Sequence, residues 1–401
     1  MKIERTLRII RTFVTVGLLG GLAACAPNFQ DSPNAFNPTA EQQASLVMPR
    51  LRQPTLSHLT NGAMIADDGK RLPMQVWLPH DANGDVTKPK AVIVALHGFN
   101  DYSHAFAMPA SIWQARGIAT YAYDQRGFGA NDNAGIWPGS ESLCRDLGTA
   151  LNLVQAQWPG VPVYALGESM GGAVILDAEG GSCSPHIHPA GIILAAPAVW
   201  ARSTMPWPNR VALWLGGRVL PWLHLTGRGL HIRPSNNIPM LIQLSRDPLT
   251  IKKTRADAVY GLVDLMDAAY QARPNPTIPT LLLYGAHDQL VPPRPTHDVA
   301  QRLAQAQSAA GNGQDNLRTA YYAHGYHMLL RDLDYRLVAG DVADWILNKN
   351  APLSPEAQKG AAQFFKMPAS ALSSKGVEPA PGLRQGPPVQ QSGTLPAVMH
   401  P

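Results

Sequence analysis

The amino-acid sequence predicts an α/β protein built on a mostly parallel sheet with helices on both faces. Two observations support this fold class. Apolar runs of strand length recur along the chain, and helical patterns lie between most of them. One long segment departs from this alternation and is interpreted as an insertion. Strands that alternate with helices favour right-handed crossovers and a parallel sheet covered on both sides.

The predicted strands are short apolar runs. The stretch "AVIVALHGF" (91–99) is continuously apolar until its last residues, which is typical of a strand buried on both faces. Further strands are predicted at 117–127, 162–169, 190–199, 278–288 and 317–325. Helical patterns separate most of them, for example at 140–157 and 296–307, and residues 61–79 favour an antiparallel hairpin at the edge of the sheet.

Residues 200–275 depart from the alternation, because they contain no clear buried strand. They carry Trp200, Trp207, Trp214 and Trp222 among other apolar residues. A segment this long and this apolar is too large for a plain connection. We expect a helical cap inserted over the C-terminal edge of the sheet, and the alternative is a small second domain unrelated to any site.

The first residues resemble a bacterial lipoprotein signal peptide. A basic start precedes the short apolar stretch "TFVTVGLLGGLAA", and the small residues of "LAAC" come directly before Cys25. We expect residues 1–24 to be removed and Cys25 to carry the lipid that attaches the protein to a membrane. The alternative is an ordinary signal peptide with Cys25 incidental. Ala26 after the cysteine favours the outer membrane of a bacterial cell envelope under lipoprotein sorting rules.

Two polar segments flank the predicted folded part at 58–350. Residues 25–57 are rich in Asn, Gln, Pro and Ser and favour a flexible tether, and the Pro-, Gln- and Ser-rich residues 351–401 favour a disordered tail. The net charge of the 401-residue chain is +5, but residues 1–24 account for +3 of it. The small remainder gives no basic surface for nucleic acid, so we expect no nucleic-acid partner.

Two cysteines, Cys144 and Cys183, remain after Cys25. An exported protein can pair them. However, Cys144 lies near the start of one predicted helix and Cys183 beyond the end of another. If both helices run the same way along the sheet, these ends lie at opposite edges, beyond the reach of a disulfide. We therefore favour two unpaired thiols.

Ser169 is the candidate nucleophile. It lies in "VYALGESMGGAVILDA" (163–178), where Gly167 and Gly171 flank it between a predicted strand and a predicted helix. The pattern G-x-S-x-G in this context forms a sharp, strained turn that lifts the serine above the sheet. The helix that begins at Met170 points its free N–H groups and the positive end of its dipole toward the same place.

A serine hydroxyl needs a base, an acid that orients the base, and donors for the oxyanion. Asp288 follows the apolar run of "LLLYGAHDQLVPP" and is the candidate acid. In "YYAHGYHMLL", after the last predicted strand, His324 and His327 are candidates for the base. We prefer His327, because Gly325 frees the loop before it and a helix follows it.

The oxyanion donors are predicted to be the backbone N–H groups of Met170 and Phe99, the latter in the loop after the first long strand. His97 lies in the same loop and is a histidine that could itself serve as a base. We expect its ring to brace this loop by hydrogen bonds instead, because the base is expected after the last strand.

Five motifs in order, "LHGFNDYSHAF", "YDQRGFGAND", "GESMGG", "YGAHDQLVPP" and "GYHMLLRD", resemble the monoacylglycerol lipase and lysophospholipase branch (serine aminopeptidase S33 type) of the α/β-hydrolase fold. The resemblance spans about residues 61–349. It implies a Ser169, Asp288 and His327 triad with oxyanion donors at Phe99 and Met170, and a structural role for Asp124 and Arg126.

The leading functional hypothesis is a serine ester hydrolase that acts on single-chain acyl esters, such as monoacylglycerols or lysophospholipids, with no metal and no organic cofactor. One alternative is a peptidase that releases N-terminal residues, which would need an acidic site in 200–275 for the α-amino group. A second alternative is a catalytically silent envelope protein that uses the fold to bind. A serine nucleophile argues against carbon–halogen and epoxide hydrolysis, which use an aspartate on this fold.

Overall fold

The computed structural model describes residues 57–183, 187–226, 232–309 and 316–366. The predicted signal peptide, Cys25, nearly all of the tether, and the tail from residue 367 lie outside these residues. Among the helices of the described part, none is long and apolar enough to cross a bilayer.

A nine-stranded sheet runs through the centre of the protein in the order β1-β2-β3-β5-β4-β6-β7-β10-β11. Its strands are β1 (His58–Thr60), β2 (Ala63–Ile65), β3 (Arg71–Trp77), β4 (Ala91–Leu96), β5 (Ile118–Tyr123), β6 (Val163–Glu168), β7 (Gly191–Ala195), β10 (Thr280–Gly285) and β11 (Leu317–Tyr322). The strands from β5 to β11 are parallel, and the antiparallel strands β1 to β3 extend one end. The predicted parallel sheet and edge hairpin are confirmed.

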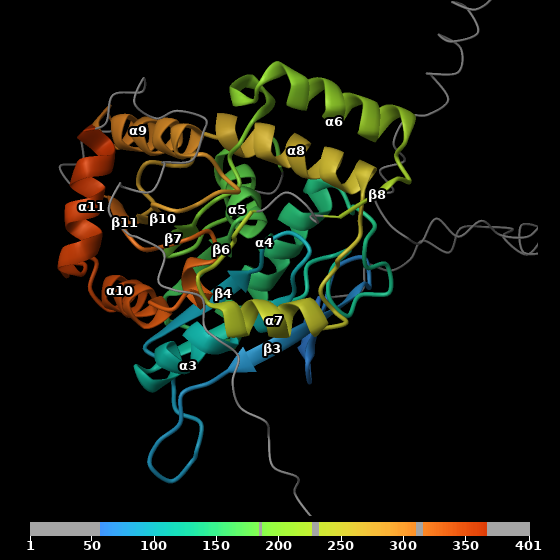
Figure 1. Cartoon of the computed structure of the whole chain (residues 1–401). Coiled ribbons are helices and arrows are strands. Elements are labelled where there is room, and N and C mark those ends of the chain that lie inside the picture. The colour runs from blue at the N-terminus through green and yellow to red at the C-terminus, as the bar shows by residue number, and fades with distance from the viewer. Residues whose placement is uncertain (1–56, 184–186, 227–231, 310–315, 367–401) are drawn as a thin grey trace, which may run out of the picture.

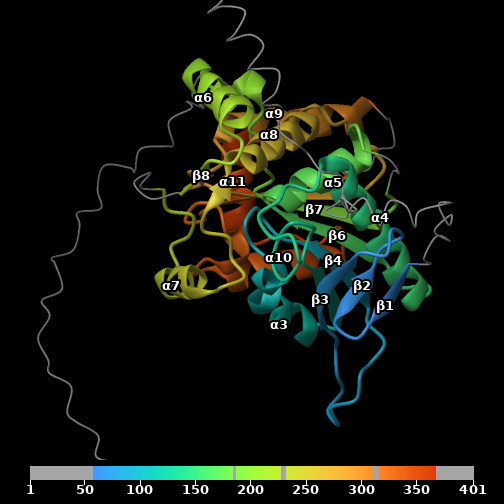
Figure 2. The ribbon, with the colours of Figure 1, turned by 90° about the vertical axis from the view of Figure 1, so that its right-hand side faces the viewer.

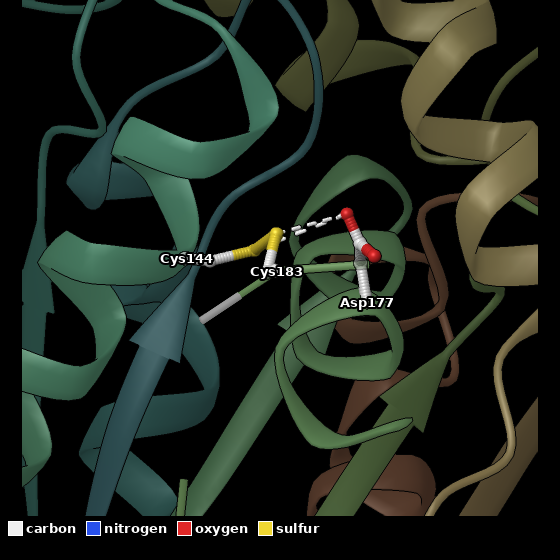
Figure 3. A group of neighbouring side chains, drawn as sticks. All are labelled: Cys144, Asp177 and Cys183. Carbon is white, nitrogen blue, oxygen red and sulfur yellow. Dashed lines mark hydrogen bonds between the residues drawn. A yellow bond between two sulfur atoms is a disulfide. The ribbon is translucent and has the colours of Figure 1, made fainter. Parts of the chain in front are cut away.

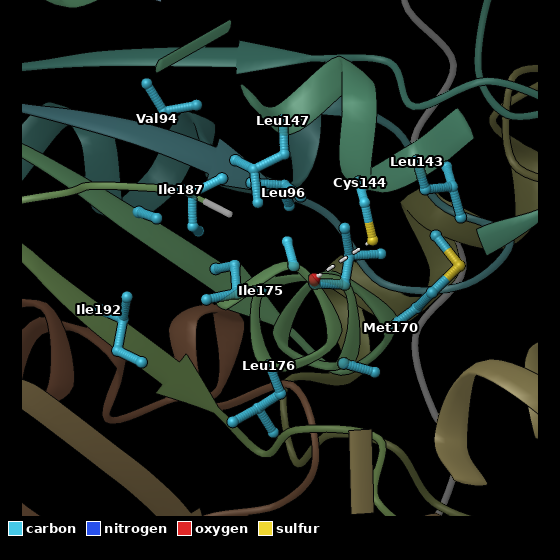
Figure 4. Close-up of a cluster of buried hydrophobic side chains, with 14 of the residues drawn as sticks. Val94, Leu96, Leu143, Cys144, Leu147, Met170, Ile175, Leu176, Ile187 and Ile192 are labelled. Carbon is cyan, nitrogen blue, oxygen red and sulfur yellow. Dashed lines mark hydrogen bonds between the residues drawn. The ribbon is translucent and has the colours of Figure 1, made fainter. Parts of the chain in front are cut away.

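Helices cover both faces of this sheet (Figure 1, Figure 2). Val92, Val94 and Leu96 of β4 belong to a core shared with α4 (Ser140–Gln157) and α5 (Met170–Gly180). The alternate residues of β4 belong to a second core, shared with α3 (Ala107–Ala115) and α10 (Tyr335–Leu347). This strict alternation follows from the two-residue period of a strand, and Figure 4 shows the first core around Val94 and Leu96.

The segment between β7 and β10 is mainly helical. It contains η2 (Arg202–Thr204), α6 (Trp207–Val219), β8 (His224–Leu225), α7 (Ile238–Arg246), β9 (Thr254–Arg255) and α8 (Ala256–Gln271). Helix α8 packs against α5 of the main body, and α6 packs on the outer side of α8 (Figure 1). We call residues 200–275 the inserted segment, and that it acts as a cap over the site remains a prediction.

The expectation of two unpaired thiols is wrong, because Cys144 and Cys183 form a disulfide with a Cα–Cα distance of 6.1 Å (Figure 3). Cys144 lies one turn into α4, and its Sγ is 3.9 Å from the backbone oxygen of Val174, in the middle of α5. After α5 the chain turns back, and both the backbone N–H and the hydroxyl of Ser182 donate to Asp177 Oδ1. The sequence prediction did not include this reversal of the chain, which places Cys183 beside Cys144.

Asp177 also lies beside the disulfide, with its Oδ2 2.9 Å from Cys183 Sγ. A disulfide sulfur carries no proton, so this is a close contact and not a donated hydrogen bond. The two sulfur atoms are bonded to each other, so the group of Cys144, Asp177 and Cys183 offers no thiolate to a metal ion.

The predicted disordered tail from residue 351 is wrong for its first part, because Pro355–Lys366 form helix α11. Ala357, Gly360, Ala361 and Phe364 are buried on one side of it. A Cβ on Gly360 would lie 2.2 Å from the backbone oxygen of Tyr321 in β11, so the helix packs very close to the sheet. Composition suggested disorder, but the spacing of these small residues and one phenylalanine follows a helical face.

Candidate active site

Ser169 lies at the turn between β6 and α5, in a conformation that few residues adopt. Its backbone has φ 54° and ψ −113°, which is strained for a residue with a side chain. A Cβ on Gly167 would lie 2.3 Å from the backbone of Gly171, and a Cβ on Gly171 would lie 2.2 Å from the oxygen of Leu96. The turn therefore requires glycine on both sides of the serine, for lack of space.

The predicted oxyanion donors belong to Met170, directly after Ser169, and to Phe99, in the loop after β4. Met170 is the first residue of α5, so its N–H has no acceptor within the helix. Phe99 follows Gly98 in the loop after β4, and a Cβ on Gly98 would lie 3.4 Å from the Cβ of Ser169. The loop therefore passes Ser169 with room for little more than a methyl group between them. The helix dipole favours negative charge at this place.

His97 braces this loop, as expected, and its two ring nitrogens are occupied. Nε2 accepts a hydrogen bond from the backbone N–H of Gln125 at 2.9 Å, and Nδ1 lies 2.8 Å from the oxygen of Gly98. Burial lowers the pKa of His97. These contacts fit a neutral ring with its proton on Nδ1, which donates to Gly98.

Asp288 and His327 form a buried pair. Oδ2 of Asp288 lies 2.8 Å from Nδ1 of His327, and Oδ1 accepts from the backbone N–H groups of Leu290 and Val291. The structure pairs His327, and not the exposed His324, with this carboxylate. A carboxylate on Nδ1 fixes the tautomer in which Nε2 is free to accept a proton.

The charges around His327 favour its protonated form. Burial alone would lower the pKa of the imidazole, but the charge and hydrogen bond of Asp288 together with the charges of Glu168 and Asp332 outweigh it. The pKa of His327 is therefore raised above its ordinary value. Such a ring can hold a proton taken from a hydroxyl.

Sheet topology brings the candidates to one edge. Ser169 follows β6, Asp288 follows β10 and His327 follows β11, and the three strands are parallel within one sheet. Their carboxyl ends therefore meet at the same edge. The backbone N–H of His287 also donates to the oxygen of Gly325, which joins the loops of the acid and the base.

The inserted segment contacts both the loop after β4, which carries Phe99, and the loop after β11, which carries His327. The N–H of Ile251 donates to the oxygen of Asn100 at 3.0 Å, and Asn100 Nδ2 donates to the hydroxyl of Thr254 at 2.7 Å. On the other side, the N–H of Met328 donates to the oxygen of Pro234 at 2.9 Å. The insertion is therefore attached directly to the loops that carry the candidate residues.

Asp124 and Arg126 have the structural role that the resemblance implies. Asp124 accepts hydrogen bonds from the backbone N–H groups of Ser103 and Ala130. The guanidinium of Arg126 pairs with Asp146 and Asp68, at 2.6 and 2.5 Å. These contacts fix the loop after β5.

Sequence reasoning did not identify Asp101, Glu168 and Arg331, which are buried charged residues at the same edge. Arg331 Nη2 donates to Asp101 Oδ2 at 2.6 Å and to Glu168 Oε2 at 2.9 Å. Glu168 directly precedes Ser169 and Arg331 follows His327 by four residues, so their positions in the sequence indicated a place near the site. Their pairing with each other and with Asp101 could not be predicted, because the three residues are far apart in the chain.

Comparisons with known proteins agree with this geometry. Residues 87–334 match the family described as "Serine aminopeptidase, S33". A monoacylglycerol lipase of Mycolicibacterium smegmatis is 25% identical over 293 residues, which cover 70% of this chain and 94% of the relative. A monoglyceride lipase of Rattus norvegicus is 30% identical over 239 residues, which cover 59% of this chain and 74% of the relative.

Solved structures show the same fold. A soluble variant of the Saccharomyces cerevisiae monoglyceride lipase superposes with a TM-score of 0.56 at 17% identity, covering 74% of this chain and 95% of that one. The Paleococcus ferrophilus monoacylglycerol lipase gives 0.52 at 19% identity, covering 69% and 98%. With a family match over more than half of its length and this α/β-hydrolase architecture, the protein belongs to the serine aminopeptidase S33 family.

Proposed function

We propose that the protein is a serine carboxylic-ester hydrolase that acts on single-chain acyl esters of the monoacylglycerol or lysophospholipid type. The observation that carries this proposal is Ser169 on a strained turn at the sheet edge that also holds the buried Asp288–His327 pair. The names of the relatives, which are monoacylglycerol and monoglyceride lipases, support an acyl ester as substrate.

The mechanism follows from these groups. His327 Nε2 takes the proton of Ser169 as its oxygen attacks the ester carbonyl, and the N–H groups of Phe99 and Met170 bind the oxyanion. His327 then gives the proton to the leaving alcohol, and an acyl-enzyme remains on Ser169. Water, deprotonated by His327, releases the carboxylic acid. Asp288 stabilises the positive imidazolium in both steps.

A peptidase is the second candidate, because the family description names one. A site for a free α-amino group would need an unengaged carboxylate in the inserted segment. Its four acidic residues all have partners: Tyr102 and the N–H of Leu249 for Asp247, Arg255 for Asp257, and Arg202 for both Asp264 and Asp267. These pairings favour the ester substrate.

The protein is further proposed to act at a membrane of the bacterial envelope, attached through a lipid on Cys25. The Cys144–Cys183 disulfide supports export, because such bonds persist in oxidising compartments. An apolar stripe on α6 supports contact with lipid, since Trp207 is 73% exposed and Trp214 is 47% exposed on one side of the helix. Replacement of Cys25 by Ser should move the protein from the membrane fraction to the soluble fraction, and unchanged fractionation would contradict the lipid anchor.

The test is a substrate panel on the wild type, on Ser169→Ala and on Ser111→Ala, an exposed serine on α3 that serves as control. The panel contains p-nitrophenyl esters of increasing chain length, a monoacylglycerol and an aminoacyl-nitroanilide. We expect the wild type and the control to hydrolyse the esters, and Ser169→Ala to lose about 10⁶-fold in kcat.

Cleavage of the nitroanilide alone would replace the ester hydrolase by the peptidase. A wild type that neither turns over any substrate nor reacts with a fluorophosphonate would support the silent binding protein instead.

A further inference from the structure

One buried arginine contacts two carboxylates from distant parts of the chain, at the edge of the sheet that carries the candidate site. Nη2 of Arg331 donates to Asp101 Oδ2 at 2.6 Å and to Glu168 Oε2 at 2.9 Å. All three side chains are at least 94% buried. We call Asp101, Glu168 and Arg331 the ionic cluster.

Each member of the ionic cluster belongs to a different segment beside a candidate site residue. Asp101 lies two residues after Phe99, in the loop that offers one oxyanion N–H. Glu168 is the last residue of β6 and directly precedes Ser169. Arg331 ends the 3-10 helix η3 (Leu329–Arg331), four residues after His327.

The inserted segment is attached to the same place. The backbone oxygen of Arg331 accepts a hydrogen bond from Asn237 Nδ2 at 2.9 Å, at the start of α7. Asp332, the next residue, accepts from the hydroxyl of Ser235 at 2.5 Å and from the backbone N–H of Tyr326 at 2.6 Å. The segment that carries the base is therefore held from both sides.

Buried charges are costly, and a well-packed apolar cluster would serve stability as well or better. A buried ionic group is best attested where it fixes one arrangement against its alternatives. Here the arrangement is the relative position of the loops that carry the nucleophile, the base and an oxyanion donor.

We propose that Arg331 is a positioning residue of the hydrolase, which holds these three loops in their reactive arrangement and keeps the charge of Glu168 beside His327. This inference rests on the proposed function, since it assigns a role within the same reaction.

The charges around His327 predict the direction in which a substitution in the ionic cluster would shift the pKa of this ring. Asp288, Glu168 and Asp332 act on His327, and each raises its pKa against the opposing effect of burial. Burial raises the pKa of Glu168, and Arg331 opposes this shift and favours the carboxylate. His97 also faces the cluster, but burial keeps its pKa low and its ring neutral.

The charge of Glu168 should therefore be visible in the pH profile. Hydrolysis needs neutral His327, so kcat/KM falls as the pH drops through the pKa of this ring. Glu168→Gln removes one negative neighbour and lowers that pKa. The acid limb of the profile then moves to lower pH, which loss of stability alone would not cause.

The experiment measures kcat, KM, the acid limb and the thermal midpoint for Glu168→Gln, Arg331→Lys and Asp146→Asn. The last is the matched control, because Asp146 is a buried carboxylate paired with an arginine in the loop after β5. Its removal leaves Arg126 paired with Asp68. We expect an acid limb like that of the wild type for this control.

Glu168→Gln should shift the acid limb downward. Arg331→Lys keeps the charge, but its ammonium ends one bond short of the Nη2 position that contacts both carboxylates. It should lower kcat by about 10- to 100-fold with KM changed less than about threefold. A Glu168→Gln profile that superposes on the wild type, or full kcat in Arg331→Lys, would overturn the proposal. If Arg331→Lys does not fold, the pH profile of Glu168→Gln still decides. Absence of turnover in the wild type would refute the proposed function instead.

Discussion

Loss of the Cys144–Cys183 disulfide should destabilise the folded protein by about 4 kcal/mol. The two cysteines are 39 residues apart in the chain. In the chain-entropy model, closing a loop of this length removes about 13 cal/mol/K from the unfolded state, which is about 4 kcal/mol at 25 °C. The perturbation is the double substitution of Cys144 and Cys183 by Ala, which leaves no lone buried thiol.

Thermal unfolding followed by circular dichroism measures the effect. For a folded part of roughly 300 residues with an unfolding entropy of about 2.1 cal/mol/K per residue, the expected loss corresponds to a midpoint about 6 °C lower. Reductant should lower the midpoint of the wild type by a similar amount. The double variant is the matched control, because reductant should leave it unchanged.

Two results would refute this reasoning. One is a double variant with the same midpoint as the oxidised wild type. The other is a non-reduced peptide map of the wild type, kept under oxidising conditions, in which Cys144 and Cys183 appear in separate peptides. Either result would remove the disulfide as a constraint on the unfolded chain.

Three further predictions concern the base, the acid and the C-terminal helix. His327→Ala should abolish ester hydrolysis, whereas His324→Ala should retain most of it; the reverse pattern in kcat would show that the wrong histidine was assigned. Asp288→Asn should lower kcat about 10⁴-fold and move the acid limb of kcat/KM to lower pH, because Asp288 raises the pKa of His327; an unchanged limb would contradict this. Because the pKa of His327 is raised in the folded state, protonation of this ring contributes to the free energy of unfolding. The contribution has its full value below the unfolded pKa of about 6.5 and is lost as the pH rises through the folded value. Stability measured against pH for the wild type and for Asp288→Asn would test this. Phe364→Ala should cost about 3 kcal/mol in urea unfolding, with exposed Gln363→Ala as control, because its ring is buried between α11 and the sheet; equal midpoints would show that α11 does not contribute to stability.

The sheet could be predicted from the sequence because its strands are local patterns. The apolar run at 91–99 contains β4, and helix α4 spans the predicted residues 140–157 without change. The turn at Ser169 could be predicted equally well from its flanking glycines. A side chain at either glycine would clash with backbone a few residues away or on the adjacent strand, so the need for glycine is visible in the local sequence.

Features that depend on distant segments could not be predicted in the same way. The disulfide depends on the reversal of the chain at Ser182 around the Asp177 carboxylate. Helix α11 depends on the surface of β11, which only the folded sheet provides. The ionic cluster joins residues 101, 168 and 331, and no local pattern shows which buried charges will meet.

The backbone angle of Ser169 has a practical consequence. An isolated peptide of this sequence would relax to ordinary angles, so the serine has its reactive orientation only while the surrounding strands and glycines hold it there. A fluorophosphonate label at this position would therefore count correctly folded molecules. In a preparation that mixes native and misassembled chains, the labelled fraction would report the yield of folding directly.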